Sequence, residues 1–211
     1  MRIFVFSLIL ILSGCQSAYY AAMEKVGVEK RDILVDRVEE AKDAQEDAQQ
    51  QFTSALEQFS QLIQFEGGEL QEVYEGLKDQ FDASSDSATR VTTRIDKVES
   101  VAEALFDEWQ EELEQYSSET LRRDSQRKLQ DTQRRYSKLL KSMRKAESKM
   151  APVLSALQDN VLYLKHNLNA AAIGALQGEF GAVKKEVDQL IKEMNSAIKQ
   201  SNDFIQSMKA K

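Results

Sequence analysis

Residues 173–208 read IGALQGEFGAVKKEVDQLIKEMNSAIKQSNDFIQSM, and this stretch has the clearest structural signal in the chain. Apolar or small residues recur along it at alternating steps of three and four. They are Ile173, Leu176, Phe180, Val183, Val187, Leu190, Met194, Ala197, Ser201, Phe204 and Met208. Such spacing places side chains on one face of an α-helix, as in a coiled coil. The stretch therefore predicts a long helix that packs against other helices along one apolar stripe.

An earlier segment, from about Ile33 to Leu62, has the same spacing and predicts a second long helix. Its stripe consists of Leu34, Val38, Ala41, a polar Gln45, Ala48, Phe52, Ala55, Phe59 and Leu62. We expect this helix to end at Glu66-Gly67-Gly68-Glu69, because glycines end helices and permit a reversal of the chain.

Two further segments, residues 70–116 and 129–168, continue the pattern, and each contains one disturbance. In the first, Ser84-Ser85-Asp86-Ser87 can compete for backbone hydrogen bonds, so a cap, a kink and an additional turn all remain open. In the second, Pro152 lacks the amide hydrogen that a helix interior uses, and we expect a bend between Lys149 and this proline. After Leu157 the stripe changes phase and continues at Val161, Leu164 and Leu168.

The remaining reversals are expected at Tyr116–Glu119 and at His166–Asn169. Asn169 is suited to cap the last helix, with Leu168 before it and Ile173 after it forming a hydrophobic staple. Comparable helices joined by short reversals favour antiparallel neighbours. The predicted fold class is therefore all-α, an elongated antiparallel coiled-coil-like bundle of about four long helices.

Charge supports one of these pairings. Residues 98–121 contain eight acidic side chains and no Lys or Arg, while residues 122–150 contain eleven basic side chains against three acidic ones. A reversal at residues 116–119 would lay these opposite charges side by side. Exposed ion pairs contribute only about 0–1 kcal/mol each, so we expect them to set register more than stability.

Composition agrees with long helices in a single domain, residues 29–211. The chain has 28 Lys and Arg against 35 Asp and Glu, 30% charged residues, one Pro and eight Gly. Its net charge of −7 makes it a poor general binder of nucleic acid or of anionic lipid.

The first residues predict a membrane anchor. Arg2 precedes an apolar run, Ile3 to Leu12, which has the layout of a secretory signal and is too short to span a bilayer. Leu12-Ser13-Gly14-Cys15 closely resembles the lipobox of bacterial lipoproteins, which are cleaved before the cysteine and acylated on it. We expect a signal peptide at 1–14 and a lipid-attached Cys15 that begins an anchor and stalk, residues 15–28. The alternative is an ordinary signal peptide or short membrane helix with an incidental cysteine.

An acylated Cys15 would hold the mature chain at a membrane surface, because burial of acyl chains is strongly favourable. It would also leave no thiol for a disulfide. Gln16 is not the aspartate that resembles an inner-membrane retention signal. We therefore expect a lipid-anchored protein of the bacterial cell envelope, with the outer membrane facing the periplasm favoured.

We expect no catalytic, cofactor or metal site. His166 is the only histidine, so it cannot assemble a metal site alone, and it is the only possible base for a Ser/His/Asp triad. Gly174, Gly178 and Gly181 form G-x-x-x-G-x-x-G, but no strand precedes them, which argues against a dinucleotide-binding loop. Small residues at this spacing predict instead that a neighbouring helix approaches closely.

The basic run from Arg122 to Lys149 is the strongest candidate for binding nucleic acid or anionic lipid, since Arg and Lys at this density attract phosphate. We favour internal pairing with residues 98–121. Export removes nucleic acid from reach, and aromatic side chains for base stacking are nearly absent from the run.

Five segments carry a family resemblance: MEKVG (23–27) with KRDILVDRV (30–38), FDEW (106–109), MAPVL (150–154) and LYLKHNLNA (162–170). Together they resemble an uncharacterised family of bacterial lipoproteins, domain-of-unknown-function family 2959. The resemblance spans nearly the whole mature chain. It implies an all-helical envelope protein and brings no established activity or catalytic residues.

We therefore expect a non-enzymatic, membrane-anchored periplasmic lipoprotein that acts as a structural or adaptor bundle and contacts an unidentified envelope protein. One alternative is a carrier for lipids or other amphiphiles, whose helices part to expose the Met- and aromatic-bearing interior. Another is a cell-wall tether, suggested by the ending Lys209-Ala210-Lys211, which loosely resembles that of the lysine-terminated major outer-membrane lipoprotein.

Overall fold

The computed structural model describes residue 23, residues 27–64, residue 67 and residues 70–209. Five helices follow one another there: α2 (Lys30–Ile63), α3 (Leu70–Leu113), α4 (Glu119–Ser148), α5 (Met150–His166) and α6 (Ala170–Lys209). No β-strand occurs within this part of the chain. The all-α fold class is therefore confirmed.

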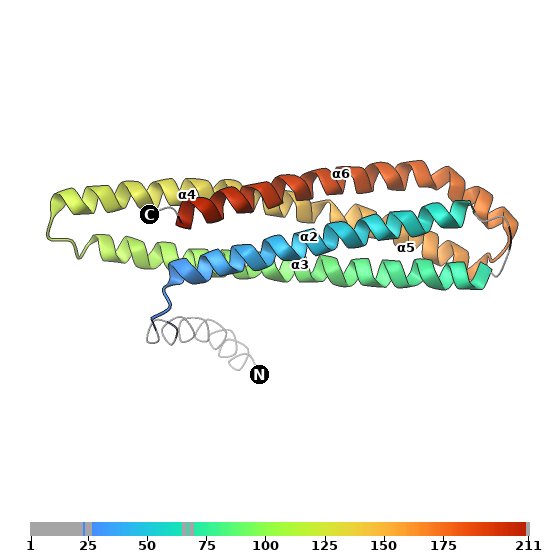
Figure 1. The fold of residues 1–211 in the computed structure, drawn as a ribbon, viewed down its shortest axis with the longest axis horizontal. Coiled ribbons are helices and arrows are strands. Elements are labelled where there is room, and N and C mark those ends of the chain that lie inside the picture. The colour runs from blue at the N-terminus through green and yellow to red at the C-terminus, as the bar shows by residue number, and fades with distance from the viewer. Residues whose placement is uncertain (1–22, 24–26, 65–66, 68–69, 210–211) are drawn as a thin grey trace, which may run out of the picture.

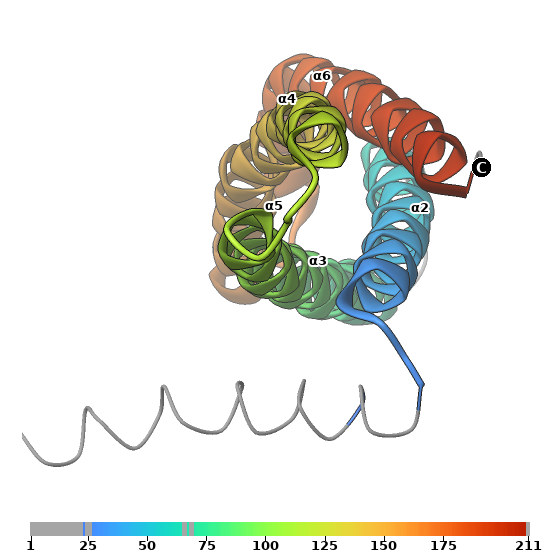
Figure 2. The ribbon, with the colours of Figure 1, turned by 90° about the vertical axis from the view of Figure 1, so that its left-hand side faces the viewer.

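The helices form an elongated antiparallel bundle, in which α4 and α5 run one after the other as a single bent rod (Figure 1). Seen from the end, α2 lies between α3 and α6, and the α4–α5 rod closes the ring (Figure 2). Among the described helices, none has an apolar stretch long enough to cross a membrane. The bundle is held by the apolar faces that its rods turn toward one another.

The predicted stripe of α2 is the most regular part of the core. All nine of its positions, including Gln45, are fully buried. Phe52 and Phe59 are its largest side chains, and burial of a Phe contributes about 1.5–3 kcal/mol. The ring of Phe59 meets that of Phe180 in α6 edge to face, with ring centroids 5.5 Å apart. The stripe therefore joins α2 to its neighbours along its whole length.

The serine cluster at residues 84–87 adds no turn, because α3 continues through it without interruption. Ser84 is fully buried, and its hydroxyl donates a 2.7 Å hydrogen bond to the carbonyl of Gln80, one turn earlier. Ser87 is also buried, and its hydroxyl accepts a hydrogen bond from Arg90. Because these two buried hydroxyls find partners on their own helix, the cluster is compatible with a continuous helix.

The bend predicted before Pro152 is confirmed and lies at Lys149, between α4 and α5. Pro152 cannot donate to the carbonyl of Ser148, four residues earlier, and its ring would crowd that carbonyl in a continuous helix. The chain ends α4 at Ser148 and begins α5 at Met150. Pro152 then sits in the first turn of α5, where helical amides lack intrahelical acceptors in any case.

The two other described reversals agree with the predictions. The α3–α4 turn occupies residues 114–118, and the hydroxyl of Ser118 accepts from the amide of Leu121 at 3.4 Å. Asn169 caps α6, because its Oδ1 accepts from the amide of Ala172 at 3.2 Å. The proposed staple between Leu168 and Ile173 stays a prediction. The expected reversal at 66–69 falls between α2 and α3, and of those residues only Gly67 is described.

At one end of the bundle, α3 and α4 extend past the start of α2 and the end of α6 (Figure 1). Lys30, the first residue of α2, forms a 2.8 Å ion pair with Glu108 of α3, which fixes the offset. Beyond that point, α3 and α4 are joined by a hydrogen bond of 2.8 Å from the indole of Trp109 to the hydroxyl of Ser125. This end is called the hairpin end below. The opposite end carries the α5–α6 turn.

Candidate functional site

Cys15, the predicted lipid-attachment residue, lies outside the described residues, as does the predicted signal peptide, residues 1–14. The predicted stalk, residues 15–28, is described only at Met23, Gly27 and Val28. Lipid attachment at Cys15 therefore stays a prediction.

His166 is the last residue of α5 and its side chain is exposed. Within the described residues, no group of three or more His, Cys, Asp or Glu side chains is arranged to hold a metal ion. The side chains that could carry chemistry near His166 belong instead to a cavity between α5 and α6.

This α5–α6 cavity has a volume of about 490 Å³ and opens to solvent. From α5 it is lined by Asp159, Asn160 and Tyr163, and from α6 by Glu179, Glu186 and several small side chains. The small residues include Ala156, Ala175 and Ala182. Because these side chains are too short to fill the space between the two helices, a hollow remains where a regular stripe would have packed.

The cavity is acidic. Asp159, Glu179 and Glu186 line it, and none of the three takes part in an ion pair with a described residue. The Oε2 atom of Glu186 is buried and has no hydrogen-bond partner among the described residues. A buried carboxylate oxygen without a partner is costly, because it has lost water without gaining a donor. The cavity therefore favours a ligand that brings positive charge or hydrogen-bond donors.

Exposed apolar side chains surround the same end of the bundle. Leu162 is 50% exposed, Tyr163 41% and Leu168 40%. The placement of Leu168 corrects the predicted stripe of residues 129–168, in which Val161 and Leu164 are buried as expected. Because α5 ends at His166, Leu168 lies outside the helix and its side chain is no longer placed by the helical spacing. Of the three exposed side chains, Tyr163 lines the cavity itself, and an exposed aromatic side chain at a cavity is typical of an interaction surface.

The prediction for Gly174, Gly178 and Gly181 is wrong. A Cβ atom added at any of the three would meet nothing within 4 Å, so no neighbouring helix approaches them closely. The residues lie on α6 away from its buried stripe, because that stripe already faces the core at Ile173 and Leu176. The first half of α6 therefore presents small residues to solvent next to the cavity.

We define the distal surface as the α5–α6 cavity with the exposed apolar side chains and the three glycines beside it. Its parts come from the last turns of α5, the α5–α6 turn and the first half of α6. The phase change after Leu157 was the available sign of irregular packing here. Sequence reasoning missed Asp159, Glu179 and Glu186, because nothing distinguishes them from other solvent-facing acids before α5 and α6 are placed together.

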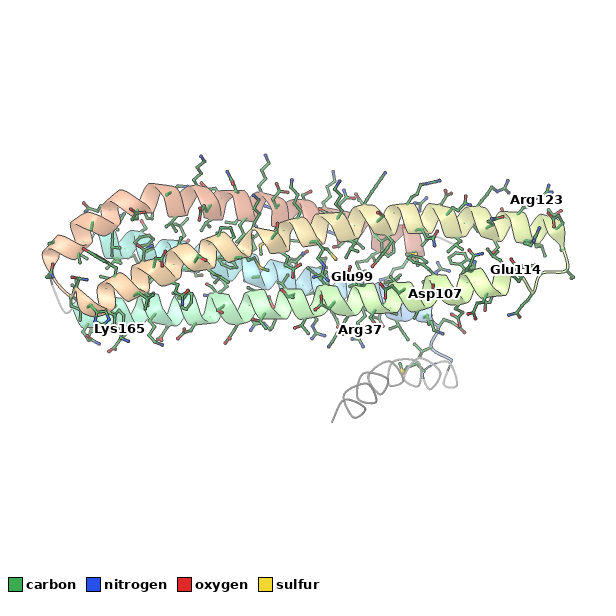
Figure 3. The ribbon with its side chains drawn as sticks, turned by 180° about the vertical axis from the view of Figure 1, so that it is seen from behind. Arg37, Glu99, Asp107, Glu114, Arg123 and Lys165 are labelled. Atoms are coloured by element: carbon green, nitrogen blue, oxygen red, sulfur yellow. The ribbon has the colours of Figure 1, made fainter. Side chains whose placement is uncertain are left out.

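The predicted charge pairing between residues 98–121 and 122–150 involves fewer ion pairs than expected. These segments do lie side by side on α3 and α4 (Figure 3), but the described ion pairs between these helices converge on Arg144. Other bases of α4 pair within their own helix: Arg122–Glu119, Arg123–Glu119, Arg127–Asp124, Lys128–Asp124 and Arg134–Asp131. Acids three or four residues away along a helix are nearer than those across the hairpin. The outer face of α4 is therefore basic and exposed.

Comparison with known protein families places most of the chain in one of them. The model of a family described as a protein of unknown function (DUF2959) matches residues 19–208. No curated protein and no solved structure matches the chain.

Proposed function

We propose that this chain, which belongs to the DUF2959 family, is a non-enzymatic adaptor of the bacterial envelope. In this proposal an acylated Cys15 attaches the start of the chain to a membrane, with the outer membrane facing the periplasm favoured. The helical bundle then presents its distal surface to a protein partner.

The observation that carries this proposal is the difference between the two ends of the bundle. Residues 15–29 lead into α2, which begins near the hairpin end, while the distal surface lies beside the α5–α6 turn (Figure 1). An anchor at the start of α2 would leave the distal surface about one bundle length from the attachment point. The 34 residues of α2, which rise about 1.5 Å each, give this distance as about 50 Å.

The composition of the distal surface supports a protein partner over a lipid. Three carboxylates that form no ion pair with a described residue line the cavity, and an acyl chain would gain nothing from them while keeping them out of water. Exposed Leu and Tyr side chains beside polar groups are typical of protein interfaces. The carrier hypothesis is therefore less well supported than the adaptor hypothesis. The cell-wall tether depends on Lys211, which lies outside the described residues.

Two experiments test the two parts of the proposal. Incorporation of labelled palmitate, compared with Cys15→Ala, tests the anchor, and a wild-type chain without label would overturn it. For the adaptor part, a photo-crosslinking amino acid replaces Tyr163 at the distal surface. In the control it replaces Leu121, which is exposed near the hairpin end.

We expect the probe at position 163 to form a discrete adduct with one protein in intact envelopes, and the probe at position 121 not to form it. The adduct should weaken when Asp159 and Glu179 are both replaced by the neutral amides. Absence of any adduct at position 163, or the same adduct at both positions, would contradict the adaptor proposal.

A further inference from the structure

A second cavity lies at the hairpin end, where α2 begins and α6 stops against the α3–α4 hairpin. It has a volume of about 370 Å³ and is independent of the distal surface. Its lining comes from all four rods of the bundle: Arg31 from α2, Trp109 from α3, Lys128, Asp131, Thr132 and Arg135 from α4, and Ser207 and Met208 from α6. We call it the hairpin cavity.

The charge of the hairpin cavity is opposite to that of the α5–α6 cavity. Arg31, Lys128 and Arg135 contribute three positive charges to its lining, and Asp131 contributes the single negative one. Asp131 is already paired with Arg134, which does not line the cavity. Lys128 and Arg135 belong to the basic run of α4, and Arg31 of α2 adds a third positive charge to it here.

The neutral hydrogen-bond donors of the lining are already in use. The hydroxyl of Thr132 donates to the carbonyl of Lys128 at 2.9 Å, and that of Ser207 to the carbonyl of Phe204 at 2.7 Å. The indole N–H of Trp109 is used by Ser125. These three groups therefore have no proton left to donate, and new donors must come from the cations.

The three cations differ in how far they are already engaged. Arg31 donates to the backbone carbonyl of Met208 and so caps the end of α6. Lys128 pairs with Asp124 at 2.9 Å in an exposed position. Arg135 takes part in no ion pair with a described residue. A guanidinium has five donors in a planar fork, which suits bidentate binding of a phosphate or carboxylate.

The size of the cavity and the presence of Trp109 narrow the ligand class. The volume exceeds what a single inorganic anion would fill, so a fitting ligand carries a second, uncharged part beside its anionic group. Because the indole N–H is already bonded, Trp109 offers that part the apolar surface of its ring. A phosphate ester suits several cations because it offers them more acceptor oxygens than a carboxylate does, and a monoester also carries more negative charge.

We propose that the hairpin cavity binds a phosphate ester, with Arg135 and Lys128 holding the phosphate and Trp109 covering the uncharged part. The phosphate can belong to a soluble ester or to the headgroup of a phospholipid. The proposal does not depend on the anchor or on the distal surface, because its residues are separate from both.

Trp109 provides a direct readout, since it is the only tryptophan of the chain and lines the cavity. The test uses a chain that begins at Gln16, which lacks Cys15 but keeps the described core from Met23 to Met208. Its intrinsic fluorescence is followed during titration with glycerol 3-phosphate, with phosphatidylglycerol vesicles and with phosphatidylcholine vesicles.

We expect a saturable change in fluorescence with glycerol 3-phosphate or with vesicles. Arg135→Gln should weaken the affinity about tenfold, the value of one charge-assisted hydrogen bond. Lys128→Gln should act in the same direction. Lys138→Gln is the matched control, because this exposed base of α4 does not line the cavity and should change the affinity by less than about twofold.

The two sources of phosphate are separated by the titrations. A response to phosphatidylglycerol vesicles without one to glycerol 3-phosphate assigns the headgroup of an anionic lipid, and the converse assigns a soluble ester. The absence of a saturable change with every probe would overturn the proposal. So would equal affinities of wild type and Arg135→Gln, with the helical content of both chains confirmed by circular dichroism. Because Cys15 is absent from these chains, neither result bears on the anchor.

Discussion

The guanidinium of Arg144 in α4 lies 2.6 Å from the carboxylate of Asp96 in α3, and this contact fixes the register of the α3–α4 pair. Arg144 also contacts Glu99 in α3 and, at 2.9 Å, Glu147 in its own helix. Partial burial lowers the pKa of Arg144, but hydrogen bonds to Glu147, Glu99 and Asp96 outweigh this effect and raise it overall. One partly buried cation is thus shared by three acids at the junction of α3 and α4.

Replacement of Arg144 should destabilise the fold more than replacement of other partly exposed side chains. Arg144→Gln leaves three neighbouring carboxylates without their shared partner, so we expect the free energy of unfolding to fall by about 1–2 kcal/mol. Urea denaturation measures the change, and added salt should reduce it. Lys141→Gln, one turn away and exposed, should cost less than about 0.5 kcal/mol. Equal losses in the two variants would show that the contact with α3 does not matter.

Tyr136 should make the bundle sensitive to alkaline pH. Its ring packs edge-on against Phe106 and Phe204, with centroids 5.4 and 6.5 Å away. Burial raises the pKa of Tyr136, and the nearby carboxylates of Glu99 and Glu103 raise it further. The folded state therefore holds the phenol proton more tightly than the unfolded state, in which the pKa is about 10.

The stabilisation from the neutral phenol is fully present below pH about 10 and is lost as the pH rises above that value. Tyr136→Phe cannot ionise, so its melting temperature should fall less above pH 10 than that of the wild type. At neutral pH the two should be nearly equal, because the rings have the same shape. A parallel decline of both proteins at high pH would contradict the assignment.

Gln45 should be replaceable with a gain in stability. It is fully buried in the stripe of α2, and within the part of the chain that the structure describes neither its Nε2 nor its Oε1 atom has a hydrogen-bond partner. A buried polar group without partners costs about 1–3 kcal/mol, so Gln45→Met should raise the free energy of unfolding by an amount of that order. Gln50→Met, exposed in the same helix, is the control for a general effect of methionine. A loss of stability in Gln45→Met would point to a hidden partner for the amide.

The exposed glycines of α6 allow a similar test. Gly178 lies in a helix with nothing within 4 Å of a Cβ position, and Ala is favoured over Gly in helices by about 0.5–1 kcal/mol. Gly178→Ala should therefore stabilise the bundle by that amount in thermal unfolding. Gly76→Ala should gain less, because its Cβ would lie 2.8 Å from the Nε2 atom of Gln58, which would have to move. Destabilisation by Gly178→Ala would show that another helix lies against this face.

The apolar spacing predicted most of the fold because it depends on local geometry. The nine stripe positions of α2 are buried, Asn169 caps α6, and the bend falls before Pro152. These features depend on rotation about one helix or on the chemistry of one residue. Spacing cannot decide features that depend on where a neighbouring helix lies.

Three outcomes illustrate that limit. The sequence allowed Ser84 to begin a turn. In the structure α3 continues because Ser84 is buried and its hydroxyl donates a hydrogen bond to the carbonyl of Gln80. Gly178 has the spacing of a close helix contact, but no described residue lies within 4 Å of its Cβ position. Arg135 and Trp109 lie on the two helices of the hairpin, and the cavity that they line also needs Arg31 of α2 and the end of α6 beside them.

The offset ends of the rods determine how the bundle would carry a mechanical load. A pull on the start of α2, resisted at the α5–α6 turn, acts along the axis of α2 (Figure 1). The layers from Leu34 to Leu62 would then have to slide past α3 and α6 together, since shear loads every layer at once while peeling loads one at a time. All of these layers would therefore resist such a pull together.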